Sequence, residues 1–118
     1  MKPVILALLL VVVAAASGWS EELVFDLRVV DGHLPEDMRR IRVHQNDAVN
    51  LRWTVDRPLT LHLHGYDIEK RIAPGPPSVM SFIAYATGRF PVNVHGSAGP
   101  GGAAHDETPL TVIEVYPR

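Results

Sequence analysis

The chain has 118 residues, a formal net charge of −2 at pH 7 and no cysteine. This length suffices for one domain with a modest hydrophobic core. Without cysteine, disulfides and every kind of thiolate metal site are excluded. The slightly negative charge argues against a surface that binds nucleic acid or anionic lipid. Packing, aided by any bound ligand, must therefore stabilise the fold.

The first residues are typical of a secretory signal peptide. Met1 and Lys2 form a short basic start, and residues 4–16 form an unbroken apolar run. Small residues follow, and we expect cleavage after Ala16 or Gly18. The run is shorter than the roughly 20 residues that span a bilayer. We therefore expect residues 1–18 to direct export to the periplasm or the exterior and residues 19–118 to form the mature domain, the alternative being an uncleaved N-terminal anchor.

The rest of the chain is dominated by segments in which apolar and polar residues alternate, which is the period of a half-buried β-strand. In chain order these segments are residues 23–29, 41–44, 49–55, 59–64, 68–72, 79–85, 90–95 and 110–116. Turn residues separate them, and residues 35–40 are expected to form at most one short helical turn. Seven or eight short strands at regular spacing predict an antiparallel β-sandwich, with Trp53 in its core.

Two histidines stand out in the segment Leu61-His62-Leu63-His64-Gly65-Tyr66. Since side chains alternate faces along a strand, His62 and His64 point to the same face, about 6.5–7 Å apart along the strand. The glycine that follows permits a tight turn. Two imidazoles in this arrangement can begin a metal site built from nitrogen ligands.

A low-complexity loop, residues 96–104, joins the last two expected strands and is bracketed by His95 and His105. It is longer than a hairpin requires, so it allows His105 to fold back toward His95. The alternative is a disordered loop with incidental histidines. His33 and His44 stand apart in sequence, and we interpret them as surface residues.

Four stretches together resemble the cupredoxin family: RVHQND at residues 42–47, VNLRWT at 49–54, LHLHG at 61–65 and GRFPVNVH at 88–95. The resemblance covers residues 23–117 and is to small secreted cupredoxin-like proteins. It implies an all-β, Greek-key sandwich of seven to eight strands, with ligands at one end, where the last two strands are joined. The His-Gly pair also resembles an element of nitrite reductases and multicopper oxidases that supplies a ligand to non-blue copper.

The chain departs from the family where a blue-copper site would lie. A type 1 site needs a cysteine thiolate, two histidines and usually an axial methionine. Alignment on residues 88–90 puts Val94 at the cysteine position and Leu59 near the position of the upstream histidine. Met38 and Met80 lie outside the expected ligand loop. A type 1 centre, and electron transfer through it, is therefore excluded.

If the family topology holds, the strand end with His64 and the loop between the last strands share one end of the sandwich. The candidate ligands there are His62, His64, His95 and His105. Three or four neutral imidazoles suit copper, with zinc as the other possibility. The leading hypothesis is a periplasmic or secreted protein that handles or delivers copper without catalysis. The alternatives are a metal-free interaction module for a periplasmic or membrane partner and a mononuclear copper enzyme.

The remaining polar residues give weaker signals. Asp67 is interpreted as a plain turn aspartate, the alternative being an acceptor that orients an imidazole. Arg39, Arg40 and Arg42 flank a strand and are expected to form a solvated edge that discourages aggregation. The sequence shows no recognisable serine–histidine–acid arrangement, phosphate loop or dinucleotide fingerprint.

Overall fold

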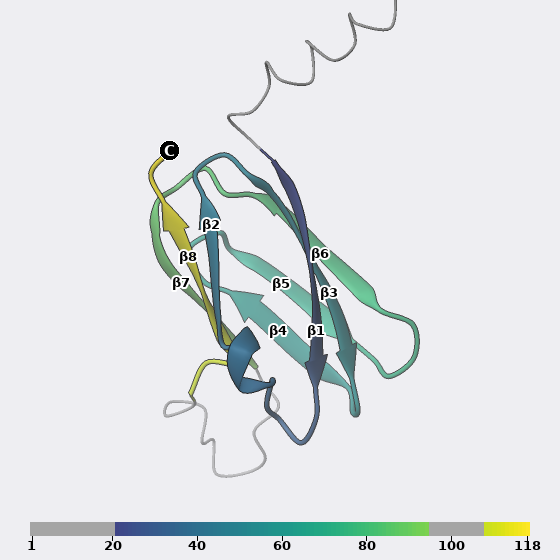
Figure 1. Ribbon diagram of the computed structural model, residues 1–118. Helices are drawn as coiled ribbons and strands as arrows, with labels where there is room; N and C mark the ends of the chain where they lie inside the picture. The colour runs from purple at the N-terminus through teal and green to yellow at the C-terminus, as the bar shows by residue number, and fades with distance from the viewer. Residues whose placement is uncertain (1–20, 95–107) are drawn as a thin grey trace, which may run out of the picture.

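The computed structural model describes residues 21–94 and 108–118, which form a two-layered β-sandwich (Figure 1). The elements in chain order are β1 (Glu22–Val29), the 3-10 turn η1 (Glu36–Met38), β2 (Arg40–His44), β3 (Ala48–Val55), β4 (Leu59–Leu63), β5 (Ile68–Ile72), β6 (Ser78–Ile83), β7 (Gly88–Val94) and β8 (Thr111–Tyr116). The strands confirm the all-β prediction. No helix within the described ranges is long and apolar enough to cross a membrane.

One sheet has the strand order β1-β3-β6, and the other has the order β2-β8-β7-β4-β5. Strands β1, β2 and β3 follow one another in sequence but alternate between the two layers, as the Greek-key prediction requires (Figure 1). The expectation of purely antiparallel pairing was wrong, because β1 pairs with β3 in parallel and β2 pairs with β8 in parallel. Alternation of side chains reports which face of a strand is buried, and it carries no information about the direction of the neighbouring strand.

The core lies between the two sheets and is made by the apolar residues of each alternating pattern. Trp53 on β3 and Leu61 on β4 are both 0% exposed, and Met80 on β6 is 2% exposed. Full burial of a side chain such as Leu61 or Met80 stabilises the fold by roughly 1.5–3 kcal/mol. Trp53 is therefore a core residue, as predicted.

The β2–β3 turn is held by the buried carboxylate of Asp47. Its oxygens accept hydrogen bonds from the backbone N–H of His44 at 2.8 Å and of Glu21 at 3.2 Å, and they pair with the Arg118 guanidinium. Burial raises the pKa of Asp47, but the backbone hydrogen bonds and Arg118 together lower it below its ordinary value. This carboxylate therefore joins the start of β1, the β2–β3 turn and the end of the described chain.

Candidate metal centre

Strand β4 positions His62 on the outer face of the five-stranded sheet. Leu59, Leu61 and Leu63 are 7%, 0% and 0% exposed, so the residues between them point outward. In register, His62 lies between Asn93 on β7 and Glu69 on β5. Its side chain is 19% exposed. The predicted face of His62 is therefore confirmed, and the imidazole is partly covered rather than fully solvated.

His64 lies just beyond β4, which ends at Leu63, one residue earlier than expected. The His64 N–H donates a hydrogen bond to the Pro91 carbonyl at 3.0 Å. Because N–H and C=O of one residue point to the same side of a strand, Pro91 would return this bond, but proline has no N–H. The pairing of β4 with β7 therefore stops here, and the exposed His64 starts a turn.

The turn depends on Gly65, as the sequence predicted. Gly65 has a φ of +89°, a conformation that residues with a Cβ rarely adopt. A methyl group built on Gly65 would overlap the Phe90 ring. Close packing against β7 and backbone geometry thus both require glycine after His64.

Tyr66 anchors the same turn to the sandwich. Its hydroxyl donates to the Ala86 carbonyl at 2.7 Å and accepts from the Ala86 N–H at 3.1 Å. Its ring centroid lies 4.9 Å from that of Phe82 and 4.8 Å from that of Phe90. Burial raises the pKa of Tyr66 above its ordinary value of 10.0, although the hydrogen bond with Ala86 opposes this. The neutral hydroxyl can thus both donate and accept, and it links the turn to Ala86.

These supports bring the two imidazoles together. The ring centroids of His62 and His64 lie 4.2 Å apart, with their planes at 59°. The rings therefore converge to less than the spacing expected along a strand. Asp67 Oδ1 lies 3.8 Å from His62 Nε2, which is too long for a hydrogen bond, and the Asp67 side chain is fully exposed. Asp67 therefore lies at ion-pair distance from His62 without a hydrogen bond between these two atoms.

Two imidazoles alone make an incomplete metal site. Within residues 21–94 and 108–118, no group of three or more His, Cys, Asp or Glu residues is placed to hold a metal ion. The other two candidate ligands, His95 and His105, lie outside the described residues. Any site with three nitrogen ligands therefore has to be completed from that segment.

The flanks of the segment 95–107 attach beside β4. Val94 pairs with Leu61, and the Leu110 N–H donates to the Val92 carbonyl at 2.8 Å. The register sets Asn93 opposite His62, whereas His64 bonds to Pro91, further back along β7. Because β4 and β7 are antiparallel, the Val94 end of β7 lies toward the start of β4, whereas His64 follows the end of β4. The expectation that the His64 end of β4 and the loop between the last strands share one end of the sandwich was therefore wrong. The alternation of residues does not report strand direction, and the observed direction brings the entry to the segment nearer to His62 than to His64.

The other predicted positions also have clear places. His33 and His44 are exposed, as expected of surface residues. Leu59 and Val94, which stand at the type 1 ligand positions, point toward the core: Leu59 is 7% exposed and Val94 packs half-buried against it. Met80 is also in the core. The arrangement of side chains agrees with the exclusion of a blue-copper centre.

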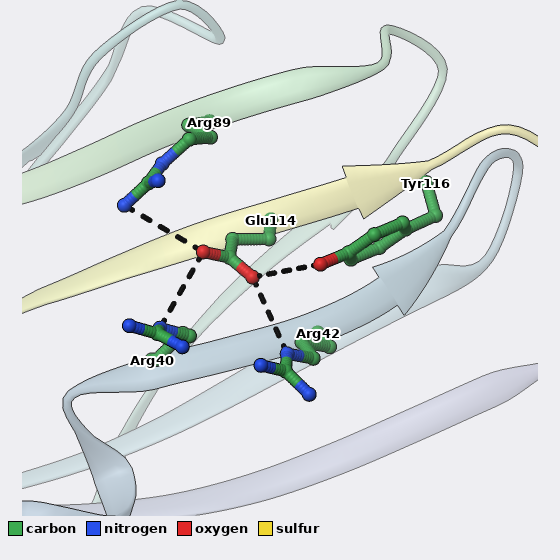
Figure 2. Close-up of polar contacts among 5 residues, drawn as sticks. All are labelled: Arg40, Arg42, Arg89, Glu114 and Tyr116. Carbon is green, nitrogen blue, oxygen red and sulfur yellow. Dashed lines mark hydrogen bonds and ion pairs between the residues drawn. The ribbon is translucent and has the colours of Figure 1, made fainter.

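Sequence reasoning missed a second cluster on the same face, centred on Glu114 of β8 (Figure 2). Its Oε1 lies 3.3 Å from Arg42 Nε and accepts from the Tyr116 hydroxyl at 3.1 Å, while Oε2 lies 3.5 Å from Arg40 Nε and 3.6 Å from Arg89 Nη2. Burial raises the pKa of Glu114, but Tyr116 and the three arginines together lower it below 4.5. The sequence signal was a lone acid in an apolar strand, which does not reveal its partners.

Arg40 and Arg42 had been predicted to form a solvated edge. They lie on β2, the edge strand of the five-stranded sheet, and their side chains are 58% and 62% exposed. The solvated position is confirmed for these two residues and for Arg39, which is also exposed, while the effect on aggregation stays a prediction. Arg40 and Arg42 in addition pair with Glu114.

Solved structures with a similar fold include a copper enzyme and a domain of an oxidase. A chain in the cryo-EM structure of a heme-copper terminal oxidase dimer matches with a TM-score of 0.65 and 17% identity, over 95% of this chain and 91% of that one. The periplasmic domain of subunit II of cytochrome oxidase from Bradyrhizobium japonicum matches with a TM-score of 0.61 and 16% identity, over 80% and 84%. The fold is a cupredoxin fold.

Copper nitrite reductase from Nitrosomonas europaea is also similar, with a TM-score of 0.59 and 17% identity. The match covers 82% of this chain and 42% of the reductase chain, so the likeness is to one part of that enzyme. No family model matches the chain, and no curated protein sequence matches it. At identities this low, the structural likeness establishes the fold alone. The resemblance to cupredoxins without the type 1 cysteine is therefore confirmed as a likeness of fold.

Proposed function

We propose that this protein binds a copper ion through histidines only and handles or delivers that ion outside the cytoplasm. The observation that carries the proposal is the convergence of the His62 and His64 rings, 4.2 Å apart, on the outer face of a cupredoxin fold. His95 and His105 are the proposed additional ligands, because they bracket a segment whose flanks attach to β7 beside β4.

The chemistry of the ligands favours copper. Imidazole nitrogen binds both copper and zinc, and among divalent first-row ions copper generally binds such sites most tightly. The chain has no thiolate, so bound Cu(II) would lack the strong charge-transfer colour of blue copper. Zinc remains the second candidate ion.

The comparisons support a copper-related role and an extracytoplasmic location. The similar structures include a copper nitrite reductase and a periplasmic oxidase domain. We propose that residues 1–18 are the signal peptide that takes the chain to the same side of the membrane. The intact mass of exported protein tests this step, and a mature species that still begins at Met1 would contradict it.

The metal site is tested by titrating purified protein with Cu(II) and recording binding isotherms and electron paramagnetic resonance spectra. We expect a tetragonal signal with nitrogen coupling, and affinity that falls on acidification because protons compete for the imidazoles. His62→Ala, His64→Ala and His95→Ala should each weaken binding by roughly tenfold or more. His44→Ala is the matched control, since His44 is exposed and lies opposite Tyr116, at the end of β8 away from segment 95–107. Equal, weak binding by all four variants would reject the site.

A second candidate function is a metal-free interaction module. The exposed arginines around Glu114 favour it, because they form a charged surface that needs no metal. This function would become the better explanation if the histidine variants and the unaltered protein bound copper equally weakly.

A further inference from the structure

The outer face of the five-stranded sheet carries excess positive charge. Arg40 and Arg42 of β2 and Arg89 of β7 surround the single carboxylate of Glu114 (Figure 2). Three guanidinium groups against one carboxylate leave two positive charges uncompensated within this cluster. The chain as a whole has a net charge of −2, so the cluster is a local feature rather than part of a basic protein.

The arginines retain free donor capacity toward solvent. Each reaches Glu114 through one nitrogen, and their side chains are 58%, 62% and 67% exposed for Arg40, Arg42 and Arg89. A guanidinium group has five N–H donors in a planar fork that matches a carboxylate. Glu114 thus contacts all three arginines, and most of their N–H donors remain open to solvent over one area of the sheet.

The surroundings of the cluster suit a protein partner. Tyr116 is 44% exposed and donates to Glu114, so an aromatic ring accompanies the arginines. Pro91 and Val112, which pair across β7 and β8, are half-buried on the same face. Arginine and tyrosine are enriched among the residues that contribute most to protein–protein binding.

The positive excess is not uniform across this face. Glu36 and Asp37 share a wide, open hollow with Arg39, Arg40 and Arg42 at the rim toward η1, so both signs of charge occur there. On the other side, Arg89 lies over β7 beside Glu114. The excess is therefore centred between Arg42 and Arg89.

We propose that this face docks an acidic surface of a protein partner, whose carboxylates are received by Arg42 and Arg89. The arginines come from β2 and β7, on either side of β8, and this spread suits an extended protein surface better than a small free anion. The negative net charge of the chain disfavours long anionic polymers and anionic membranes, whose fields act on the whole molecule. A partner with a local acidic patch senses mainly the arginines.

This surface adjoins the candidate metal ligands without depending on them. Arg40 pairs with Val112, Val112 with Pro91, and Pro91 bonds to His64, so one row across the sheet links the arginine side to the histidine side. A partner seated on the arginines would therefore lie beside His64. Docking requires no metal, so the peptide titration can succeed when copper binding fails, and copper binding can succeed when docking fails.

The test is a nuclear magnetic resonance titration of the purified protein with a glutamate decapeptide at low salt. We expect shifts confined to β2, β7 and β8, and binding that weakens severalfold in about 0.3 M NaCl. Arg42→Gln and Arg89→Gln should each weaken binding roughly fivefold. Arg52→Gln is the matched control, because Arg52 is exposed and ion-paired with Asp26 on the other sheet. It should leave the affinity unchanged.

Glu114→Gln supplies a second variant with the opposite expected effect. It removes the buried negative charge and retains the arginines, so it should tighten peptide binding about threefold. Parallel titrations use phosphatidylglycerol vesicles, single-stranded DNA and inorganic phosphate. The proposal would be overturned if the peptide did not bind, or if its shifts fell on the three-stranded sheet. It would also be overturned if Arg52→Gln weakened binding as much as the other arginine variants, or if Glu114→Gln gave no gain. Tighter binding of any of the other anions would overturn it as well.

Discussion

The two polar clusters on the outer face of the five-stranded sheet differ in how they are built. The histidine cluster comes from residues two apart in sequence, and a tightly packed turn positions it. The carboxylate cluster joins β2, β7 and β8, and Arg42 and Glu114 are 72 residues apart. The first is evident in the sequence but incomplete as a metal site among the described residues. The second cannot be recognised in the sequence, but all of the residues that contact its carboxylate in the structure are described.

The comparison teaches that the two clusters depend on different forces. Shape complementarity holds the histidine turn, through the contact of Gly65 with Phe90 and the packing of Tyr66. Electrostatics and hydrogen bonding hold the carboxylate cluster, which stays ionised because its partners outweigh the effect of burial. The contacts described for His64, Gly65 and Tyr66 involve neither Glu114 nor its three arginines. A substitution in one cluster should therefore leave the other almost intact.

The largest expected effect is that of Gly65→Ala. The added methyl group meets the Phe90 ring at a positive φ, so we expect a loss of about 3 kcal/mol in the free energy of unfolding. Gly32→Ala is the matched control, because Gly32 has a φ of +80° but no atom within 4 Å of the added group. It should lose only about 1 kcal/mol. Denaturant unfolding measures both, and equal losses would show that packing against Phe90 is unimportant.

Tyr66→Phe is expected to have an intermediate effect. It removes the hydroxyl that serves both the N–H and the carbonyl of Ala86, so unfolding should become easier by about 1–2 kcal/mol. Tyr85→Phe is the control, since Tyr85 is 59% exposed, and it should change stability by less than about 0.5 kcal/mol. Thermal unfolding distinguishes the two. A loss from Tyr85→Phe as large as that from Tyr66→Phe would refute the anchoring role of the Tyr66 hydroxyl.

The smallest effect is expected from Glu114→Gln as a function of pH. The pKa of Glu114 is lowered on folding, so the unfolded chain binds more protons below about pH 4.5 and the stabilisation by the carboxylate is lost as pH falls further. In Glu114→Gln the free energy of unfolding should therefore fall less steeply as the pH is lowered from about 4.5. Asp47→Asn should flatten a separate part of this decline, because the pKa of Asp47 is also lowered. An unchanged slope in Glu114→Gln would show that the arginines do not stabilise the ionised form.

Much of the site could be predicted from local sequence. The alternation of Leu61 and Leu63 with His62 placed the imidazole on the outer face, and Gly65 marked the turn. The close approach of the rings could not be predicted, since it depends on Pro91 ending the pairing with β7 and on Tyr66 reaching Ala86. Both contacts join segments that are distant in sequence: Tyr66 and Ala86, for example, are 20 residues apart. Local sequence patterns do not reveal such contacts.

By itself the sequence determined the all-β class, the inward faces of the strands, the exclusion of thiolate chemistry and the pairing of two histidines on one face. These properties follow from the alternation of side chains along a strand and from residue identity, which are local. Only the tertiary structure decided that β1 and β3 run parallel, that β2 lies beside β8, and that three arginines meet Glu114. The physical reason is that strand pairing depends on how distant segments pack around a common core, and no single segment contains that information.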